Sequence, residues 1–253
     1  MRLHYRKYGS GPALLLLHGL FGSLNNWHSH ARVFAERSTV YAIDQRNHGA
    51  SPHDPVSSYP LMASDLREFM DDHGIADAVV LGHSMGGKTA MQFAGMYPGR
   101  ARAIVSVDMA PRAYPPKHEE IFKVLFSIDP RKYETREEIE VAMRPTIQNP
   151  AVRQFLVTNV IRDEGGHLRW RMNVPALRAS YDALSSATIL PAPFTKPALF
   201  VRGELSSYLI PEDMEDIRRY FPAATMVAIP GAHHWVHADA PALFQQAILE
   251  FLS

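Results

Sequence analysis

One serine in this chain stands in a setting that suits nucleophilic chemistry. Ser84 lies at the centre of a G-x-S-x-G pattern formed with Gly82 and Gly86. The apolar residues 78–81 before it predict a buried strand, and residues 88–94 after it suit a helix. Glycines permit so tight a strand-to-helix turn because they lack a Cβ and tolerate unusual dihedral angles. Such a turn would present the hydroxyl beside helix N–H groups that can bind developing negative charge.

A serine hydroxyl is a weak nucleophile without a base that removes its proton. Three histidines, His233, His234 and His237, follow the last predicted strand and come after Ser84 in the chain, as the base of this pattern does. His234 is our candidate base. The other two compete with it, and otherwise we expect them to be partly exposed loop residues. A metal site built from the three is disfavoured, because no carboxylate or further histidine lies at helpful spacing.

Composition restricts the classes of function that remain. The chain has 253 residues, of which 46% are hydrophobic and 21% charged, so it can bury a full core. Its 26 basic and 26 acidic residues cancel, which argues against nucleic acid or an anionic membrane surface as a partner. The absence of cysteine excludes disulfides, thiolate metal sites and a cysteine nucleophile. Nothing in the sequence implies a metal or an organic cofactor.

The N-terminal residues predict neither export nor a membrane anchor. They lack the long apolar core of a secretory signal. The longest early apolar run, residues 13–17, is far too short to span a bilayer. We therefore expect a cytoplasmic protein.

Strand patterns alternate with helix patterns along most of the chain. The predicted strands cover residues 3–8, 13–17, 39–43, 78–81, 103–107, 198–201 and 225–229, and the predicted helices cover residues 24–37, 61–73, 84–97, 212–220 and 241–252. This order predicts an α/β fold with a mostly parallel sheet flanked by helices. Ligands in such sheets bind beyond the carboxyl ends of the strands. Six polar residues follow predicted strands and should therefore gather at one edge: His18, Asp44, Ser84, Asp108, Ser206 and His234.

Residues 111–195 differ in composition from the rest of the chain. They carry helical patterns at 119–126, 136–143, 151–161 and 174–184, with many prolines between them and no clear buried strand. We interpret them as a helical insertion, here called the cap. The core domain would then consist of residues 1–110 and 196–253.

Four motifs in this order resemble the α/β-hydrolase superfamily over essentially the whole chain. They lie in residues 18–27, 44–51, 82–91 and 107–111. The sequences of these motifs are similar to those of the bacterial YbfF esterases and the related mitochondrial esterases. The resemblance implies a serine hydrolase that cleaves carboxylic esters, with acyl-CoA thioesters as a further substrate class. It also implies a cap over the site. The expected partner is a small acyl ester or thioester, and the expected assembly is a monomer or homodimer.

The resemblance assigns the remaining catalytic positions. The family's Gly-His-Trp pattern aligns with residues 233–235, which favours His234 as the base. Many relatives carry the acid in a Gly-x-x-Asp pattern, but here Ser206 stands in the place of the aspartate. A serine cannot hold a negative charge, so Asp108 is the predicted acid, with Glu204 as the alternative. The expected oxyanion hole is formed by the backbone N–H groups of Met85 and Leu20, with that of Phe21 as the alternative to Leu20.

Other polar residues near these motifs are expected to support the loops. We expect His18 and His83 to hydrogen-bond loop backbone, and Asp44, Arg46 and Ser51 to stabilise a turn. For Lys88 we expect a solvated side chain or one that extends along apolar surface to water, with contact to an acidic group of the substrate as the alternative.

The leading hypothesis is therefore a carboxylic ester hydrolase with a Ser-His-Asp triad and an acyl-enzyme intermediate. One alternative keeps the triad and performs C–C bond hydrolysis or a lyase reaction. A second is a non-catalytic ligand-binding homologue, supported only by Ser206 in the usual place of the acid. A dehalogenase is disfavoured because it would need an aspartate where Ser84 stands.

Overall fold

A seven-stranded sheet with the order β1-β3-β2-β4-β5-β8-β9 forms the centre of the computed structural model, which describes residues 1–253. Only β1 is antiparallel to its neighbour, and all other neighbouring pairs are parallel. The predicted α/β fold with a mostly parallel sheet is thus confirmed. The strands of this sheet are β1 (Tyr5–Tyr8), β2 (Ala13–Leu17), β3 (Thr39–Ile43), β4 (Ala78–His83), β5 (Ala101–Val107), β8 (Ala198–Gly203) and β9 (Ala224–Ile229).

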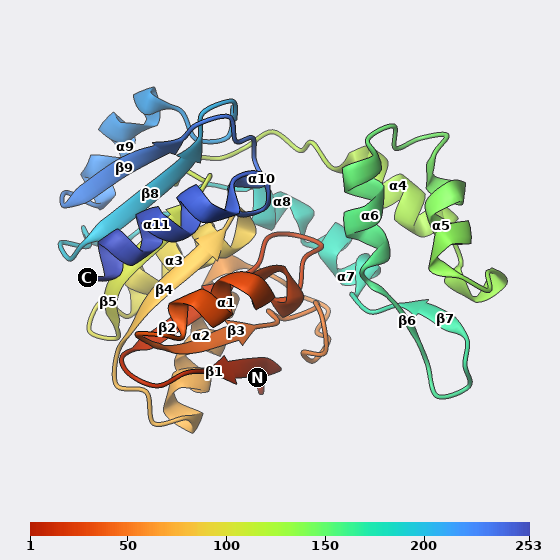
Figure 1. Cartoon of the computed structure of the whole chain (residues 1–253), viewed down its shortest axis with the longest axis horizontal. Coiled ribbons are helices and arrows are strands. Elements are labelled where there is room, and N and C mark those ends of the chain that lie inside the picture. The colour runs from red at the N-terminus through yellow and green to blue at the C-terminus, as the bar shows by residue number, and fades with distance from the viewer.

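Helices cover both faces of this sheet (Figure 1). One face packs against α1 (His28–Phe34) and α11 (Pro241–Leu252). The other packs against α2 (Tyr59–Asp72), α3 (Met85–Met96) and α9 (Met214–Tyr220). Strand β2 shows why both faces must be covered, because Leu14 and Leu16 point into one apolar layer while Leu15 and Leu17 point into the other.

Some predicted helix limits were wrong. The helix predicted from residue 24 begins as a 3-10 turn over Leu24–Trp27, and α1 follows it. The helix predicted from residue 212 likewise begins within a 3-10 turn over Pro211–Asp213, and α9 follows that turn. The short helix α10 (Val236–Asp239), which begins two residues after His234, was not predicted. None of the helices combines the length and the apolar character needed to cross a lipid bilayer.

Most of the residues between β5 and β8 form a lobe beside the sheet, seen on the right in Figure 1. The lobe contains α4 (Glu119–Ser127), a 3-10 turn (Pro130–Lys132), α5 (Arg136–Met143), α6 (Pro150–Val157), β6 (Val160–Arg162), β7 (Leu168–Trp170), α7 (Val174–Ala179) and α8 (Tyr181–Ser185). It has its own cluster of buried apolar residues, which Phe21 and Met85 of the sheet region join.

The lobe also corrects two predictions within residues 111–195. The helix predicted over 151–161 ends at Val157, and the chain continues as a hairpin of β6 and β7. The side chain of Asn159 donates a hydrogen bond to the carbonyl of Phe21 at 2.7 Å, and this contact holds the chain where it leaves the helix. The helix predicted over 174–184 is divided in two at Ser180.

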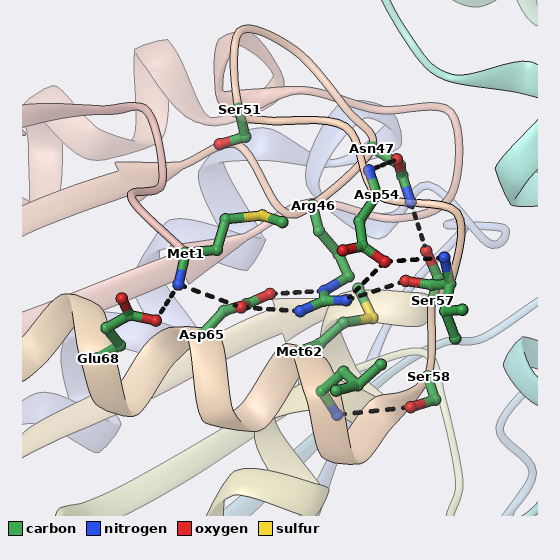
Figure 2. Close-up of polar contacts among 12 residues, drawn as sticks. Met1, Arg46, Asn47, Ser51, Asp54, Ser57, Ser58, Met62, Asp65 and Glu68 are labelled. Atoms are coloured by element: carbon green, nitrogen blue, oxygen red, sulfur yellow. Dashed lines mark hydrogen bonds and ion pairs between the residues drawn. The ribbon is translucent and has the colours of Figure 1, made fainter.

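A buried ion pair holds the loop that follows β3 on helix α2 (Figure 2). The guanidinium of Arg46 donates to both carboxylate oxygens of Asp65, at 2.6 and 2.9 Å, and to the carbonyl of Val56 at 2.9 Å. Arg46 is only 6% exposed and Asp65 only 4%. Residue Asn47, in the same loop, adopts a φ of 65° and donates to the hydroxyl of Ser57 at 2.8 Å.

Replacement of this arginine tests how much the ion pair stabilises the fold. We expect Arg46→Met to lower the free energy of unfolding by about 3–5 kcal/mol, because it leaves the Asp65 carboxylate buried without its guanidinium. Urea denaturation measures the change. Arg67→Met is the matched control, since Arg67 pairs with Asp71 on the exposed side of α2 and its loss should cost less than about 1 kcal/mol. Equal effects of the two substitutions would contradict the prediction.

Candidate active site

Ser84 occupies a strained backbone position between β4 and α3. Its φ is 53° and its ψ is −114°, a region that residues with a side chain rarely adopt. Glycines on either side allow the turn. A Cβ on Gly82 would lie 2.0 Å from the carbonyl oxygen of Gly86, and one on Gly86 would lie 2.4 Å from that of Leu17. The spacing of the G-x-S-x-G pattern therefore follows from the close approach of backbone to backbone.

Three side chains from distant parts of the sequence form one hydrogen-bonded chain. Nε2 of His234 lies 3.1 Å from Oγ of Ser84, and Nδ1 lies 2.8 Å from Oδ2 of Asp108. A carboxylate only accepts hydrogen bonds, so the ring proton is on Nδ1 and Nε2 is free to accept the proton of the serine. The three residues follow β4, β5 and β9, at the carboxyl edge of the sheet.

The carboxylate of Asp108 is fully buried and makes three hydrogen bonds. Besides His234, it accepts from the backbone N–H of Gly203 at 3.1 Å and from the hydroxyl of Ser206. Burial raises the pKa of Asp108 to about 6, although the contacts with Ser206 and Gly203 act in the opposite direction. Ser206, the serine in the usual place of the acid, thus donates to the carboxylate of Asp108, which follows β5.

Glu204, the alternative acid, points elsewhere. Its Oε2 accepts a hydrogen bond from the N–H of Gly231 at 2.9 Å, and it makes no hydrogen bond to His234. The geometry brings Asp108, rather than Glu204, to the imidazole.

The imidazole of His234 is enclosed by other rings. The ring of Tyr208 stacks on it with a centroid distance of 3.8 Å, and Nε2 of His83 donates to the His234 carbonyl at 2.9 Å. Burial lowers the pKa of His234 below 6.5, and the nearby His118 and Lys117 act in the same direction. The ring is therefore neutral at pH 7, as a general base must be.

The loop after β2 presents backbone N–H groups near Ser84. The N–H of Phe21 donates to Nε2 of His48 at 3.2 Å and is thus already engaged. The N–H of Leu20 makes no hydrogen bond within the protein, and that of Met85 belongs to the first residue of α3. This geometry is compatible with Leu20 and Met85 as the oxyanion hole. His18 donates to the carbonyl of Gly19 at 2.8 Å and supports the loop, as predicted.

A cavity of about 760 Å³ opens above the hydrogen-bonded chain. Ser84 and His234 line it on the side of the sheet, and apolar residues of α4 and α6 line it on the side of the lobe. These apolar residues include Ile121, Val152 and Phe155. A site with one polar end and an apolar wall suits a substrate with a reactive carbonyl and an apolar chain.

The structure overturns two expectations about charged or polar side chains. Lys88 was expected in contact with solvent, yet it is 1% exposed and donates to the carbonyls of Arg112 and Ser186. His237 was expected to be partly exposed, yet it is buried against Trp27, with ring centroids 4.7 Å apart. Neither position carries a sequence signal for burial, because the elements that cover them come from distant parts of the chain.

Comparison with known proteins identifies relatives of similar length. The chain matches the family described as "alpha/beta hydrolase fold" over residues 12–136. It is 36% identical to the sn-1-specific diacylglycerol lipase ABHD11 of Mus musculus, over 96% of this chain and 81% of the relative. It is 37% identical to Esterase YbfF of Escherichia coli strain K12, over 95% of this chain and 92% of the relative. Among solved structures, a marine microorganism esterase matches with a TM-score of 0.96 and 42% identity, over 99% of both chains.

The choice between the two carboxylates can be tested by paired substitutions. Asp108→Asn should lower kcat/KM towards p-nitrophenyl acetate by about 10³–10⁴-fold, because the amide no longer fixes the imidazole tautomer or stabilises its cation. Glu204→Gln is the matched control and should leave the rate close to that of the wild type. The reverse ranking would make Glu204 the acid.

The pH dependence of the same reaction tests the protonation state of the base. If His234 is the base and Asp108 the acid, activity requires a neutral His234 and an ionised Asp108 and is lost as the pH falls through the apparent pKa of the coupled pair. Burial lowers the pKa of His234 and raises that of Asp108 only to about 6. The acid limb of kcat/KM should therefore lie below pH 6.5. A limb centred at pH 7 or above would contradict this assignment.

Proposed function

The chain belongs to the α/β-hydrolase family, in the branch that includes Esterase YbfF and ABHD11, and we propose that it hydrolyses carboxylic esters through Ser84, His234 and Asp108. The observation that carries this proposal is the hydrogen-bonded chain of these three side chains at the end of an apolar cavity.

In the proposed reaction, Oγ of Ser84 attacks the carbonyl carbon of the ester while Nε2 of His234 removes its proton. Asp108 holds the imidazole in place and stabilises its cation. The N–H groups of Leu20 and Met85 bind the negative oxygen of the tetrahedral intermediate. Its collapse breaks the ester bond, and His234 returns the proton to the leaving alcohol. Water, activated by His234, then releases the acid from the acyl-enzyme.

The apolar wall of the cavity supports a substrate with an apolar acyl group, and thioesters such as acyl-CoA form a further proposed class. The names of the relatives describe an esterase and a diacylglycerol lipase, so they agree on ester cleavage and differ in its substrate. A cap of residues 111–195 on a core of residues 1–110 and 196–253 is part of this proposal, supported by the separate apolar cluster of the lobe. A cytoplasmic location, and a monomeric or homodimeric state, remain predictions.

The contact between Ser206 and Asp108 weighs against the non-catalytic alternative. That alternative was supported only by the serine in the usual place of the acid, and this serine donates a hydrogen bond to Asp108. No specific contact in the cavity favours C–C hydrolysis or a lyase reaction over ester cleavage.

Substitution of the nucleophile tests the proposal. Ser84→Ala should abolish labelling by a fluorophosphonate and reduce turnover of p-nitrophenyl acyl esters by at least about 10³-fold, because it removes the hydroxyl that forms the acyl-enzyme in the proposed reaction. A Ser51→Ala variant, which also lacks one hydroxyl, should still be labelled. Persistent labelling of Ser84→Ala would place the nucleophile elsewhere. Faster turnover of vinylogous diketones than of simple esters would favour C–C hydrolysis.

A further inference from the structure

Lys88 is a buried lysine without an acidic partner. Its side chain is 1% exposed, and its ammonium group forms no ion pair. Instead, Nζ donates to the carbonyl of Arg112 at 2.8 Å and to the carbonyl of Ser186. Burial lowers the pKa of Lys88 to about 7. Burial of an amine is unfavourable unless its N–H groups are hydrogen-bonded, and for Lys88 these two carbonyls are the hydrogen-bond partners.

The two carbonyls that Lys88 binds belong to the two chain segments that join the helices of the cap to the sheet. Arg112 lies between β5 and α4, and Ser186 lies between α8 and β8. We call residues 111–114 and 185–188 the stem. Its two segments also bind each other, since the N–H of Tyr114 donates to the Ser185 carbonyl at 2.9 Å and that of Thr188 to the Pro111 carbonyl at 2.7 Å.

Aromatic faces complete the surroundings of the ammonium group. Nζ lies 5.0 Å from the ring centre of Tyr114, in the stem, and 5.6 Å from that of Tyr59, at the start of α2. Both distances allow a cation–π interaction. The guanidinium of Arg112 is also nearby, but it pairs with a different group, the carboxylate of Asp213, at 2.8 Å.

Lys88 lies on the helix that begins directly after Ser84. The cavity wall opposite Ser84 is formed by residues of α4 and α6, which the stem connects to the sheet. A side chain on α3 that binds both segments of the stem therefore connects that wall to the nucleophile helix.

We propose that Lys88 is a positioning residue that holds the stem of the cap on the nucleophile helix and thereby sets the size of the acyl group that the cavity binds. The part that concerns acyl size rests on the proposed ester hydrolysis, whereas the part that concerns the stem does not.

The test compares Lys88→Met with the wild type on a short and a longer ester. For p-nitrophenyl octanoate, KM should rise about tenfold with kcat changed by less than about twofold, because the apolar wall is displaced while the reacting groups are not. Turnover of p-nitrophenyl acetate, which does not reach the wall, should be nearly unchanged. Amide hydrogen exchange in residues 111–195 should become faster. Lys88→Arg keeps the cationic donors and should restore much of the octanoate KM.

Lys196→Met is the matched control. Lys196 also donates to two backbone carbonyls, those of Pro98 and Ala101, both at 2.8 Å, but it does not touch the stem. Replacement of Lys196 should change neither the ratio of octanoate to acetate turnover nor the amide hydrogen exchange in the cap. If Lys88→Met does not fold, Lys88→Gln, which keeps an N–H donor, should show a smaller change in the same direction.

Two results would overturn the proposal. One is an unchanged ratio of octanoate to acetate turnover together with unchanged amide hydrogen exchange in the cap. The other is an equal loss of acetate and octanoate turnover with loss of fluorophosphonate labelling, which would place the effect on the nucleophile helix itself. If the wild type cleaves no ester of either length, the proposed function fails, and the exchange measurement alone then decides whether Lys88 holds the stem.

Discussion

The turn at Ser84 is the steric constraint on which the rest of the site depends. It requires a residue with a side chain to adopt a positive φ between two glycines whose Cβ atoms would collide with neighbouring backbone. Three other residues with side chains share such a φ: Phe21 after β2, Asn47 after β3 and Asp108 after β5. Each such conformation costs about 1–3 kcal/mol, so it persists only where the packing of the sheet holds it. The strain is concentrated at the carboxyl edge of the sheet, where Ser84, Asp108 and His234 meet.

Several buried polar side chains in this protein bind backbone groups in addition to, or in place of, other side chains. The carboxylate of Asp108 binds the N–H of Gly203, and the ammonium of Lys88 binds two carbonyls. Arg46 donates both to the carboxylate of Asp65 and to the carbonyl of Val56. Backbone partners have fixed positions, so each of these side chains joins two parts of the chain at a defined separation. Such contacts are individually modest in energy, and their removal is costly because the remaining partner stays buried.

These contacts link the lobe to the sheet at several separate places. Lys88 binds the stem, Asn159 binds the carbonyl of Phe21, and the N–H of Asn173 donates to the carbonyl of Asn47 at 2.9 Å. Two of the loops involved carry a strained residue, and one of them also presents the N–H of Leu20. The position of the cavity wall and the position of the N–H groups near Ser84 are therefore determined by overlapping sets of residues.

The sequence alone determined the parts of this protein that depend on local patterns. The G-x-S-x-G spacing, the alternation of strands and helices, and the position of Asp108 and His234 after strands all follow from nearby residues. The tertiary structure decided where distant segments meet. It made Ser206 a hydrogen-bond donor to Asp108, and it brought the carboxylate of Glu204 to the backbone N–H of Gly231. It also buried Lys88 and His237, and it continued the chain after α6 as a hairpin. Burial and hydrogen-bond partners of a side chain depend on what covers it, and for these residues the covering atoms are remote in the sequence.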